Sequence, residues 1–346
     1  MYNAYEIKKE KGESVLYLYG TYSYEFANEF TSSDEIGKRT NQFIQNHKIP
    51  FRGNKVYLVV DGIVIKSIDI SKYLPEYSSD ISYSPDQFMV FIRYEDKVTI
   101  EVSLREYLYS ILFSYYDSSI EKETLKAICV LYNTYVYSKM REDGFVPAIS
   151  PYSHYEPLEV YQKTYSTYSK ILSLFDEVIL DTEGVYVTYE GNYILPFIHY
   201  SNSGKTLTHS NYPYLSSVKS LWDMESPYYI EIHSFSYEVL EEFLSQPISS
   251  KTKIQMIEKD HIKKLVIENR IYTLEEIKQL LSLKSTDFYL IQHLNKITII
   301  TKGYGNSLGL SIFGSNEIAK DGFFYYHILS YYFPKTKLYR HMKKLS

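Results

Sequence analysis

The clearest pattern of apolar and polar positions begins at residue 104. From there apolar side chains recur at i, i+4, i+7, i+8 and i+11, at Leu104, Leu108, Ile111, Leu112 and Tyr115. This spacing is one stripe of an amphipathic helix. The polar run Asp117-Ser118-Ser119 interrupts the stripe and predicts the cap of a second helix over residues 121–139. Further helices are predicted over residues 158–175, 237–245, from Thr273 in a capping box, and within 316–331.

Runs of β-branched and aromatic residues predict strands on both sides of these helices. Asp61-Gly62, between residues 55–60 and 63–70, is typical of a hairpin turn. Residues 71–86, with two prolines and many polar side chains, are predicted to be an exposed connection. The remaining strands are predicted over residues 15–19, 87–93, 97–102, 178–180, 185–189, 193–199, 228–235, 252–257, 262–267 and 288–301.

These patterns predict an α+β fold in which a helical core packs against antiparallel sheets. Residues 1–103 are expected to form a β-rich N-terminal region and residues 104–346 the main domain, either separately or as one composite unit. At 346 residues the chain is long enough for either arrangement.

Residues 301–315 contain four of the 14 glycines of the chain, at positions 303, 305, 309 and 314. A strand is predicted before this glycine loop (residues 301–315) and a helix after Gly314. The loop contains no carboxylate and no histidine. Its simplest interpretation is a tight turn that serves packing.

Composition excludes several classes of site. The net charge is −5 with interspersed charges, so no basic surface for nucleic acid is expected. The single cysteine, Cys129, excludes an intramolecular disulfide and a thiolate metal cluster, and its apolar helical surroundings predict a buried thiol. His199 and His209 lack a third ligand, so neither metal nor cofactor is expected.

No apolar run approaches the length that spans a bilayer. Two localisations are therefore open: a cytoplasmic chain, or an extracytoplasmic one whose membrane anchor lies outside this sequence.

Seven segments in order resemble one known family. They are Leu104-Arg105-Glu106-Tyr107-Leu108; Leu125-Lys126-Ala127 with Thr134-Tyr135; Ser201-Asn202-Ser203-Gly204; Pro213-Tyr214-Leu215 with Trp222-Asp223; Leu283 to Phe288; the glycine loop; and Ile328 to Leu338. They resemble L-x-E-Y-L, L-K-A-Q-A-V-A-A-R-T-Y, S-x-S-G-G, P-Y-L-x-x-V-x-x-x-W-D, L-R-S-T-D-F, G-R-G-Y-G-H-G-V-G-M-S-Q-Y-G-A and I-L-x-x-Y-Y-P-G-T-K-L. The chain thereby resembles the family of stage II sporulation protein D (SpoIID) and the amidase enhancer LytB, from about Ile100 to Leu338.

This resemblance implies a lytic transglycosylase that acts on peptidoglycan glycan strands without stem peptides. Such an enzyme needs a carboxylic acid to protonate the glycosidic oxygen. Counting from Leu104 without a gap, Tyr115 stands where the family has its catalytic Glu. Tyrosine, with an ordinary pKa of about 10, is a poor general acid for this reaction.

Other polar positions of the family also differ in this chain. Ile128 replaces Gln, Asn133 replaces Arg, Lys205 replaces the second Gly of S-x-S-G-G, Asn306 replaces His and Ile312 replaces Gln. Ser201, Ser203, Gly204, Tyr304 and Ser311 are retained. The resemblance thus implies a transglycosylase cleft whose shape persists while its chemistry is lost.

Three hypotheses follow. In the first, a catalytically inactive protein binds glycan strands or a cell-wall or sporulation partner through the degenerate cleft. In the second, the chain is an active lytic transglycosylase in which Asp117 replaces the acid, although i and i+2 do not share a helix face. In the third, Tyr115, Ile128 and Ile312 fill the old cleft and the chain is a pure protein-interaction scaffold. Glu123 is interpreted as an exposed carboxylate at a helix start.

Overall fold

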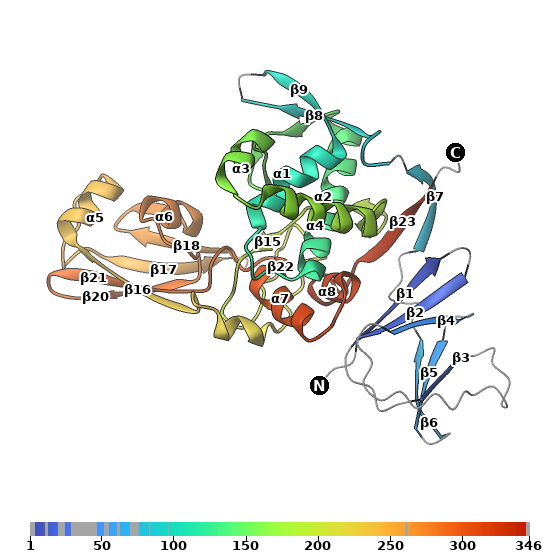
Figure 1. Cartoon of the computed structure of the whole chain (residues 1–346). Coiled ribbons are helices and arrows are strands. Elements are labelled where there is room, and N and C mark those ends of the chain that lie inside the picture. Colours follow the sequence, from blue (N-terminus) through green and yellow to red (C-terminus); the bar gives the residue numbers. More distant parts are fainter. Residues whose placement is uncertain are drawn as a thin grey trace. The chain divides into compact units, whose positions relative to one another are not determined.

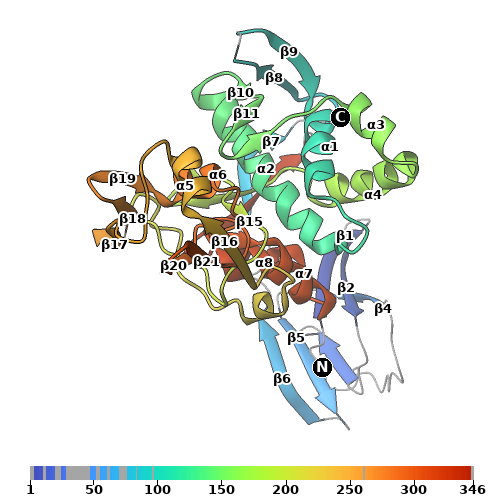
Figure 2. The same ribbon diagram turned by 90° about the vertical axis from the view of Figure 1, so that its left-hand side faces the viewer.

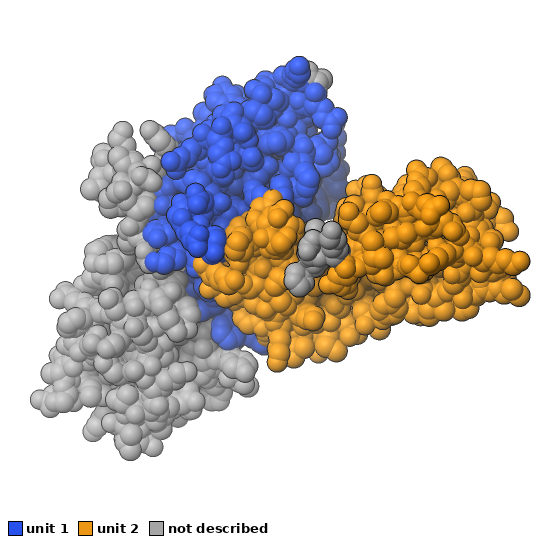
Figure 3. Space-filling model, turned by 180° about the vertical axis from the view of Figure 1, so that it is seen from behind, with its two compact units in different colours: residues 1–196, 316–330, 336–346 blue, residues 197–315, 331–335 orange. Residues whose placement is uncertain are grey.

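The computed structural model describes residues 84–343 except 96 and 260–261, and before them only the strands within residues 4–82 (Figure 1). The chain divides into two compact units (Figure 3). Unit 1 comprises Met1–Pro196, Asn316–Ser330 and Thr336–Ser346, and unit 2 comprises Phe197–Ser315 and Tyr331–Lys335.

The N-terminal strands form two antiparallel three-stranded sheets. The first contains β1 (Ala4–Glu10), β2 (Glu13–Tyr19) and β4 (His47–Phe51). The second contains β3 (Glu25–Asn28), β5 (Lys55–Val60) and β6 (Ile63–Asp69). Pairing of Val60 with Ile63 confirms the hairpin predicted here, while its turn at Asp61-Gly62 lies outside the described residues.

Helix α2 (Lys122–Glu142) is the centre of unit 1, because every residue from Thr124 to Ser138 is buried. Helices α1 (Leu104–Tyr115) and α4 (Tyr168–Asp181) pack against it (Figures 1 and 2), and α3 (Leu158–Thr164) contacts α1. The predicted stripe of α1 is confirmed, since Leu104, Leu108, Ile111 and Leu112 are all buried.

Three sheets complete the described strands of unit 1. One has the order β10-β8-β9, from β8 (Met89–Arg93), β9 (Thr99–Ser103) and β10 (Val146–Pro147). Another has the order β14-β13-β23-β7, from β7 (Glu76–Ser82), β13 (Val185–Tyr189), β14 (Asn192–Tyr193) and β23 (Lys337–Lys343). The third pairs β11 (Ile149–Ser150) with β12 (Ser153–His154).

Unit 2 contains two more three-stranded antiparallel sheets. They are β16-β21-β20, from β16 (Ile230–Ser236), β20 (Phe288–Gln292) and β21 (Lys296–Lys302), and β17-β18-β19, from β17 (Ile254–Lys259), β18 (Ile262–Ile267) and β19 (Arg270–Thr273). Helices α5 (Tyr237–Leu244) and α6 (Leu274–Leu280) share one apolar core with both sheets. A short parallel pair joins β15 (Ile198–His199) to β22 (Leu310–Ser311), and η1 (Leu221–Glu225) is a 3-10 turn. The chain crosses between the units within α7 (Ile312–Lys320) and α8 (Tyr325–Tyr332).

The α+β class is confirmed, but several local predictions were wrong. Residues 76–82, expected in an exposed connection, form β7, which pairs in parallel with β23 far along the chain. Residues 178–180, expected as a strand, belong to α4, and the helix predicted over residues 158–175 is broken between α3 and α4.

Helix boundaries also differ from prediction. Helix α2 begins after Glu121, which makes no side-chain cap, rather than at the polar run 117–119. Helix α7 begins at Ile312, so Gly314 lies inside it. The predicted caps Ser236 of α5 and Thr273 of α6 are confirmed, the latter with its full capping box.

Candidate functional site

Tyr115 is the last residue of α1, and its hydroxyl lies 2.8 Å from that of Tyr132 on α2. The Tyr132 hydroxyl donates to the carbonyl oxygen of Tyr152 at 2.7 Å. The proton between the two tyrosines must therefore come from Tyr115, which donates to Tyr132. Burial raises the pKa of Tyr115 above its ordinary value, so this side chain is a neutral donor.

The surroundings of Tyr115 are aromatic and apolar. Its ring lies 6.0 Å from that of Tyr132, and Tyr132 packs edge-on against Tyr135. Ile128, on the same helix as Tyr132, is completely buried. In the described part of the chain, no carboxylate hydrogen-bonds the Tyr115 hydroxyl.

Asp117 lies in the exposed turn between α1 and α2. Its Oδ1 accepts from both the backbone N–H and the hydroxyl of Ser119, each at 2.6 Å. This is the geometry of an Asx turn. The role of Asp117 as a relocated acid stays a prediction.

Glu123 is partly buried, which corrects the prediction of an exposed carboxylate. It pairs with Lys126 at 2.5 Å, and its Oε2 accepts from the backbone N–H of Tyr325 at 3.0 Å. Lys126, only 3% exposed, also pairs with Asp181 at 2.8 Å. This retained lysine therefore joins α2 to the end of α4.

Asn133 is buried on α2, and its Nδ2 donates to the carbonyl oxygen of Thr182 at 3.3 Å. The Thr182 hydroxyl lies 3.2 Å from the sulfur of Cys129. Cys129 is buried, as predicted, and burial raises its pKa to about 12. Ile128, Asn133 and Cys129 are thus positioned as core residues of unit 1.

In unit 2, the glycine loop and the serine loop (residues 201–204) lie against each other. Ser201 and Tyr304 exchange backbone hydrogen bonds of 2.8 and 3.1 Å, and β15 pairs with β22 beside them. Gly309 has φ of +69°, and a Cβ there would meet the carbonyl oxygen of Phe197 at 2.2 Å. Close backbone approach to Phe197 therefore requires this glycine.

Asp223, fully buried in η1, is the centre of a polar network that joins these loops. Its carboxylate accepts from Asn202 Nδ2 at 2.6 Å, from Ser311 Oγ at 2.6 Å and from Ser220 Oγ at 2.5 Å. The Tyr332 hydroxyl in turn lies 2.7 Å from Ser220 Oγ. Burial raises the pKa of Asp223 to about 6, although these hydrogen bonds oppose the shift.

His199 completes the network as a neutral side chain. Its Nε2 lies 3.1 Å from Nδ2 of Asn202, an atom that can only donate, so the ring proton sits on Nδ1. Nδ1 then donates to the carbonyl oxygen of Leu308 at 2.9 Å. Burial lowers the pKa of His199 to about 4. In the described residues, no group of three His, Cys, Asp or Glu side chains is placed to hold a metal.

The exposed part of this site is aromatic. Tyr304 is 38% exposed and packs against Tyr228 and Tyr200, with ring centroids 5.2 and 5.5 Å away. The ammonium of Lys284 lies 4.1 Å from the centre of the Tyr228 ring and pairs with Glu231 at 2.8 Å. In this platform (Tyr200, Tyr228, Tyr304 and Lys284), Tyr304 is exposed and the other three side chains are half-buried. The Lys284 ammonium lies over one face of Tyr228.

The other predicted site residues take several roles. Ser203 is half-buried, Lys205 is exposed, and Gly204 is buried with its N–H donating to Asn202 Oδ1 at 2.9 Å. Asn306 accepts from the Leu308 N–H at 3.0 Å, and Ile312 is the first residue of α7. The sequence patterns did not indicate Asp223 as the centre of the network, although the Trp222-Asp223 pair in the fourth of the seven resembling segments was its signal.

Known proteins resemble this chain over most of its length. Residues 94–189 match the family model described as "SpoIID: Stage II sporulation protein". The chain is similar to stage II sporulation protein D of Bacillus subtilis (strain 168), with 26% identity over 255 residues that cover 68% of this chain and 74% of the relative. The corresponding protein of Bacillus amyloliquefaciens is 26% identical over 250 residues, which cover 67% and 73%. None of the described helices is long and apolar enough to cross a membrane.

Proposed function

Because the chain belongs to the stage II sporulation protein D family, we propose that it acts in spore formation as a protein that binds peptidoglycan glycan strands without cleaving them. The observation that carries this proposal is the environment of Tyr115. At the place where the family's acid is expected, a neutral hydroxyl donates its proton to Tyr132. Without a carboxylic acid there, protonation of the glycosidic oxygen lacks its donor.

The platform in unit 2 supports the binding half of the proposal. Sugar rings stack on aromatic faces, and the exposed ring of Tyr304 offers such a surface beside Tyr228 and Lys284. The network around Asp223 fixes the glycine loop that carries Tyr304, so the platform is preorganised. Ser203 and Lys205 supply polar groups on the neighbouring loop.

Catalysis is tested with purified protein and glycan strands freed of stem peptides. The expected result is the absence of 1,6-anhydromuramic products in mass spectra after prolonged incubation. Products made by the wild-type protein and lost in Asp117→Ala would overturn the proposal and identify Asp117 as the acid.

Binding is tested by retention on the same strands. Tyr304→Ala should lower retention about fivefold, since stacking of one aromatic ring contributes on the order of 1 kcal/mol. Tyr289→Ala is the matched control, because Tyr289 is 44% exposed in unit 2 and lies 5.2 Å from a lysine ammonium, that of Lys302. Equal losses in both variants would contradict a specific role for the platform.

A second candidate function, a protein-interaction scaffold, is favoured by one apolar surface. Leu221 and Met224 on η1 are 60% and 47% exposed, and both lie next to Gly204. Exposed apolar groups that gather in one place mark interaction surfaces. If no strand is retained by the wild-type protein, while Met224→Lys abolishes capture of a sporulation partner, the scaffold function replaces glycan binding.

A further inference from the structure

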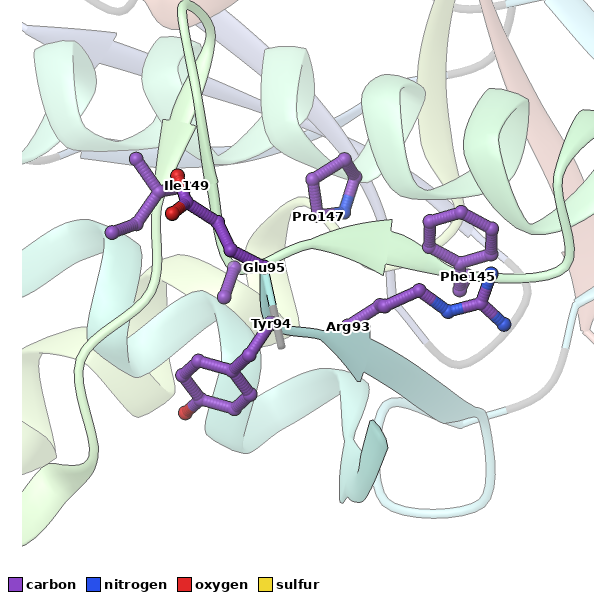
Figure 4. A pocket seen from close by; sticks show the side chains of 7 residues that line it. Arg93, Tyr94, Glu95, Phe145, Pro147 and Ile149 are labelled. Atoms are coloured by element: carbon purple, nitrogen blue, oxygen red, sulfur yellow. The ribbon is translucent and has the colours of Figure 1, made fainter. Parts of the chain in front are cut away.

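A pocket of about 470 Å³ lies in unit 1 beside the β10-β8-β9 sheet (Figure 4). It contains none of the site residues described above. Its lining comes from the end of β8 and from the chain around β10, and consists of Arg93, Tyr94, Glu95, Phe145, Pro147, Ala148 and Ile149. A volume of this size is ordinary for a small-ligand site.

Arg93 is the most informative residue of the pocket. Its guanidinium carbon lies 3.6 Å from the centre of the Phe145 ring, so the stack orients the side chain. Its backbone is fixed as well, because the Arg93 carbonyl accepts from the Ala148 N–H at 2.8 Å. Within the described residues, the guanidinium has no hydrogen-bond or ion-pair partner. Stacking occupies the face of the guanidinium and leaves its in-plane N–H groups available for a bidentate carboxylate.

Glu95 places a second charged group, a carboxylate, in the lining of the pocket. In Figure 4 the Arg93 and Phe145 side chains lie together on one side, Glu95 and Ile149 lie on the other, and Pro147 lies between them. In the same view the Arg93 guanidinium and the Glu95 carboxylate extend to opposite sides, so the two opposite charges are separate. The arrangement suits a ligand with a carboxylate at one end, hydrogen-bond donors at the other and an apolar face between. A phosphate dianion fits less well because the Glu95 carboxylate would repel it.

We propose that this pocket binds a sugar that carries a carboxylate, the chemistry of muramic acid. When a glycan strand has lost its stem peptides, each muramic acid has a free lactyl carboxylate for Arg93. Its ring hydroxyls can donate to Glu95, and its apolar ring face can lie on Pro147. The choice of muramic acid rests on the proposed function, whereas carboxylate recognition rests on Arg93 and Phe145.

The test is titration of the full chain with N-acetylmuramic acid, followed by calorimetry and by NMR of the backbone amides. N-acetylglucosamine is the matched ligand, because it lacks the lactyl carboxylate. The expected result is shift changes around residues 93–95 and 145–149 with the first sugar and at least tenfold weaker binding of the second. Arg93→Gln should weaken binding of N-acetylmuramic acid at least tenfold. Arg93→Lys should weaken it by less, because an ammonium keeps the positive charge but lacks the two parallel N–H donors of a guanidinium.

Arg141→Gln is the charge-matched control, since Arg141 is exposed on unit 1 at the end of α2, and it should bind as the wild type does. Equal affinity for both sugars, or wild-type affinity in Arg93→Gln, would overturn the proposal. N-acetylalanine carries a peptide-type carboxylate, and tighter binding of it than of the sugar would assign the pocket to a peptide end instead.

Failure of this proposal is distinct from failure of the proposed function. If denuded strands are retained equally by wild type and Arg93→Gln, glycan binding stands and the pocket is excluded from it. If strands are not retained but N-acetylmuramic acid still shifts residues 93–95 in an Arg93-dependent way, the pocket stands and the proposed function fails.

Discussion

Gly314 lies against the hydroxyl of Tyr332, so that a Cβ atom at position 314 would be 2.2 Å from that oxygen. The same atom would be 2.6 Å from Ser220 Oγ and 3.2 Å from Asp223 Oδ2. Gly314 is helical, so space rather than backbone conformation requires a glycine here. The last glycine of the loop and the buried polar network therefore depend on each other.

Gly314→Ala should destabilise the protein by about 1–3 kcal/mol, because the added methyl group must displace buried, hydrogen-bonded oxygens. Chemical denaturation of wild type and variant measures this loss. Tyr332→Phe removes the nearest of these oxygens, so Gly314→Ala should cost less in that background. Additive losses in the double variant would show that the contact with Tyr332 is not what constrains position 314.

Asp223 should make stability fall as pH rises from about 4 to 6. Its folded pKa of about 6 lies above the ordinary 3.8, so the native state holds the proton more tightly than the unfolded chain does. The stabilisation is complete below pH 3.8 and is lost as pH rises through 6, by about 3 kcal/mol. The difference between wild type and Asp223→Asn, measured by urea denaturation at several pH values, isolates this slope. A difference that does not vary with pH would contradict the buried carboxylic acid.

His199 should act in the opposite direction over an overlapping range. Its folded pKa of about 4 lies below the ordinary 6.5, so the unfolded chain binds the proton more tightly. The stabilisation is complete above pH 6.5 and is lost as pH falls through 4. In His199→Gln, stability relative to the wild type should therefore improve as the pH is lowered. Because Asn202 donates to both side chains, His199→Gln and Asp223→Asn should also be non-additive.

Helical periodicity and turn chemistry predicted the local elements well. The stripe of α1, the hairpin of β5 and β6 and the capping box at Thr273 all depend on neighbours within about ten residues. The wrong predictions concern segments whose secondary structure depends on contacts with residues far along the chain. Strand β7 exists because it pairs with β23, more than 250 residues along the chain, and its own composition does not show this partner.

The candidate site shows the same division. The glycine loop and the serine loop are each recognisable in the sequence, but no sequence pattern indicates that the Asp223 carboxylate joins them. Asp223 is one aspartate among many in the sequence, and only the convergence of Asn202, Ser220 and Ser311 distinguishes it. Similarly, the apolar run at residues 178–180 contains β-branched residues typical of strands, yet packing against α2 makes it the end of α4.

Lys126 should be important for the stability of unit 1. It is buried between Glu123 and Asp181, and a methionine there would leave both carboxylates without this cation. Lys126→Met should cost about 3 kcal/mol, in the range for breaking a buried ion pair. Lys122→Met is the control, because Lys122 is 35% exposed and pairs with Glu177 and Asp181 at the surface. That variant should lose under about 1 kcal/mol in the same denaturation experiment, and equal losses would contradict the importance of burial.

The tyrosine pair that replaces the family's acid gives the last prediction. Because Tyr115 donates to Tyr132 and Tyr132 donates to the Tyr152 carbonyl, the two hydroxyls form one chain of hydrogen bonds. Tyr115→Phe breaks the outer link and should cost about 1 kcal/mol. Tyr132→Phe breaks both links and should cost more, and the double variant should be no less stable than Tyr132→Phe alone. In Tyr115→Phe, retention on denuded glycan strands should stay within about twofold of wild type, because the Tyr115 hydroxyl is already hydrogen-bonded to Tyr132. A large loss of retention in a stably folded Tyr115→Phe would instead place this hydroxyl in contact with the glycan.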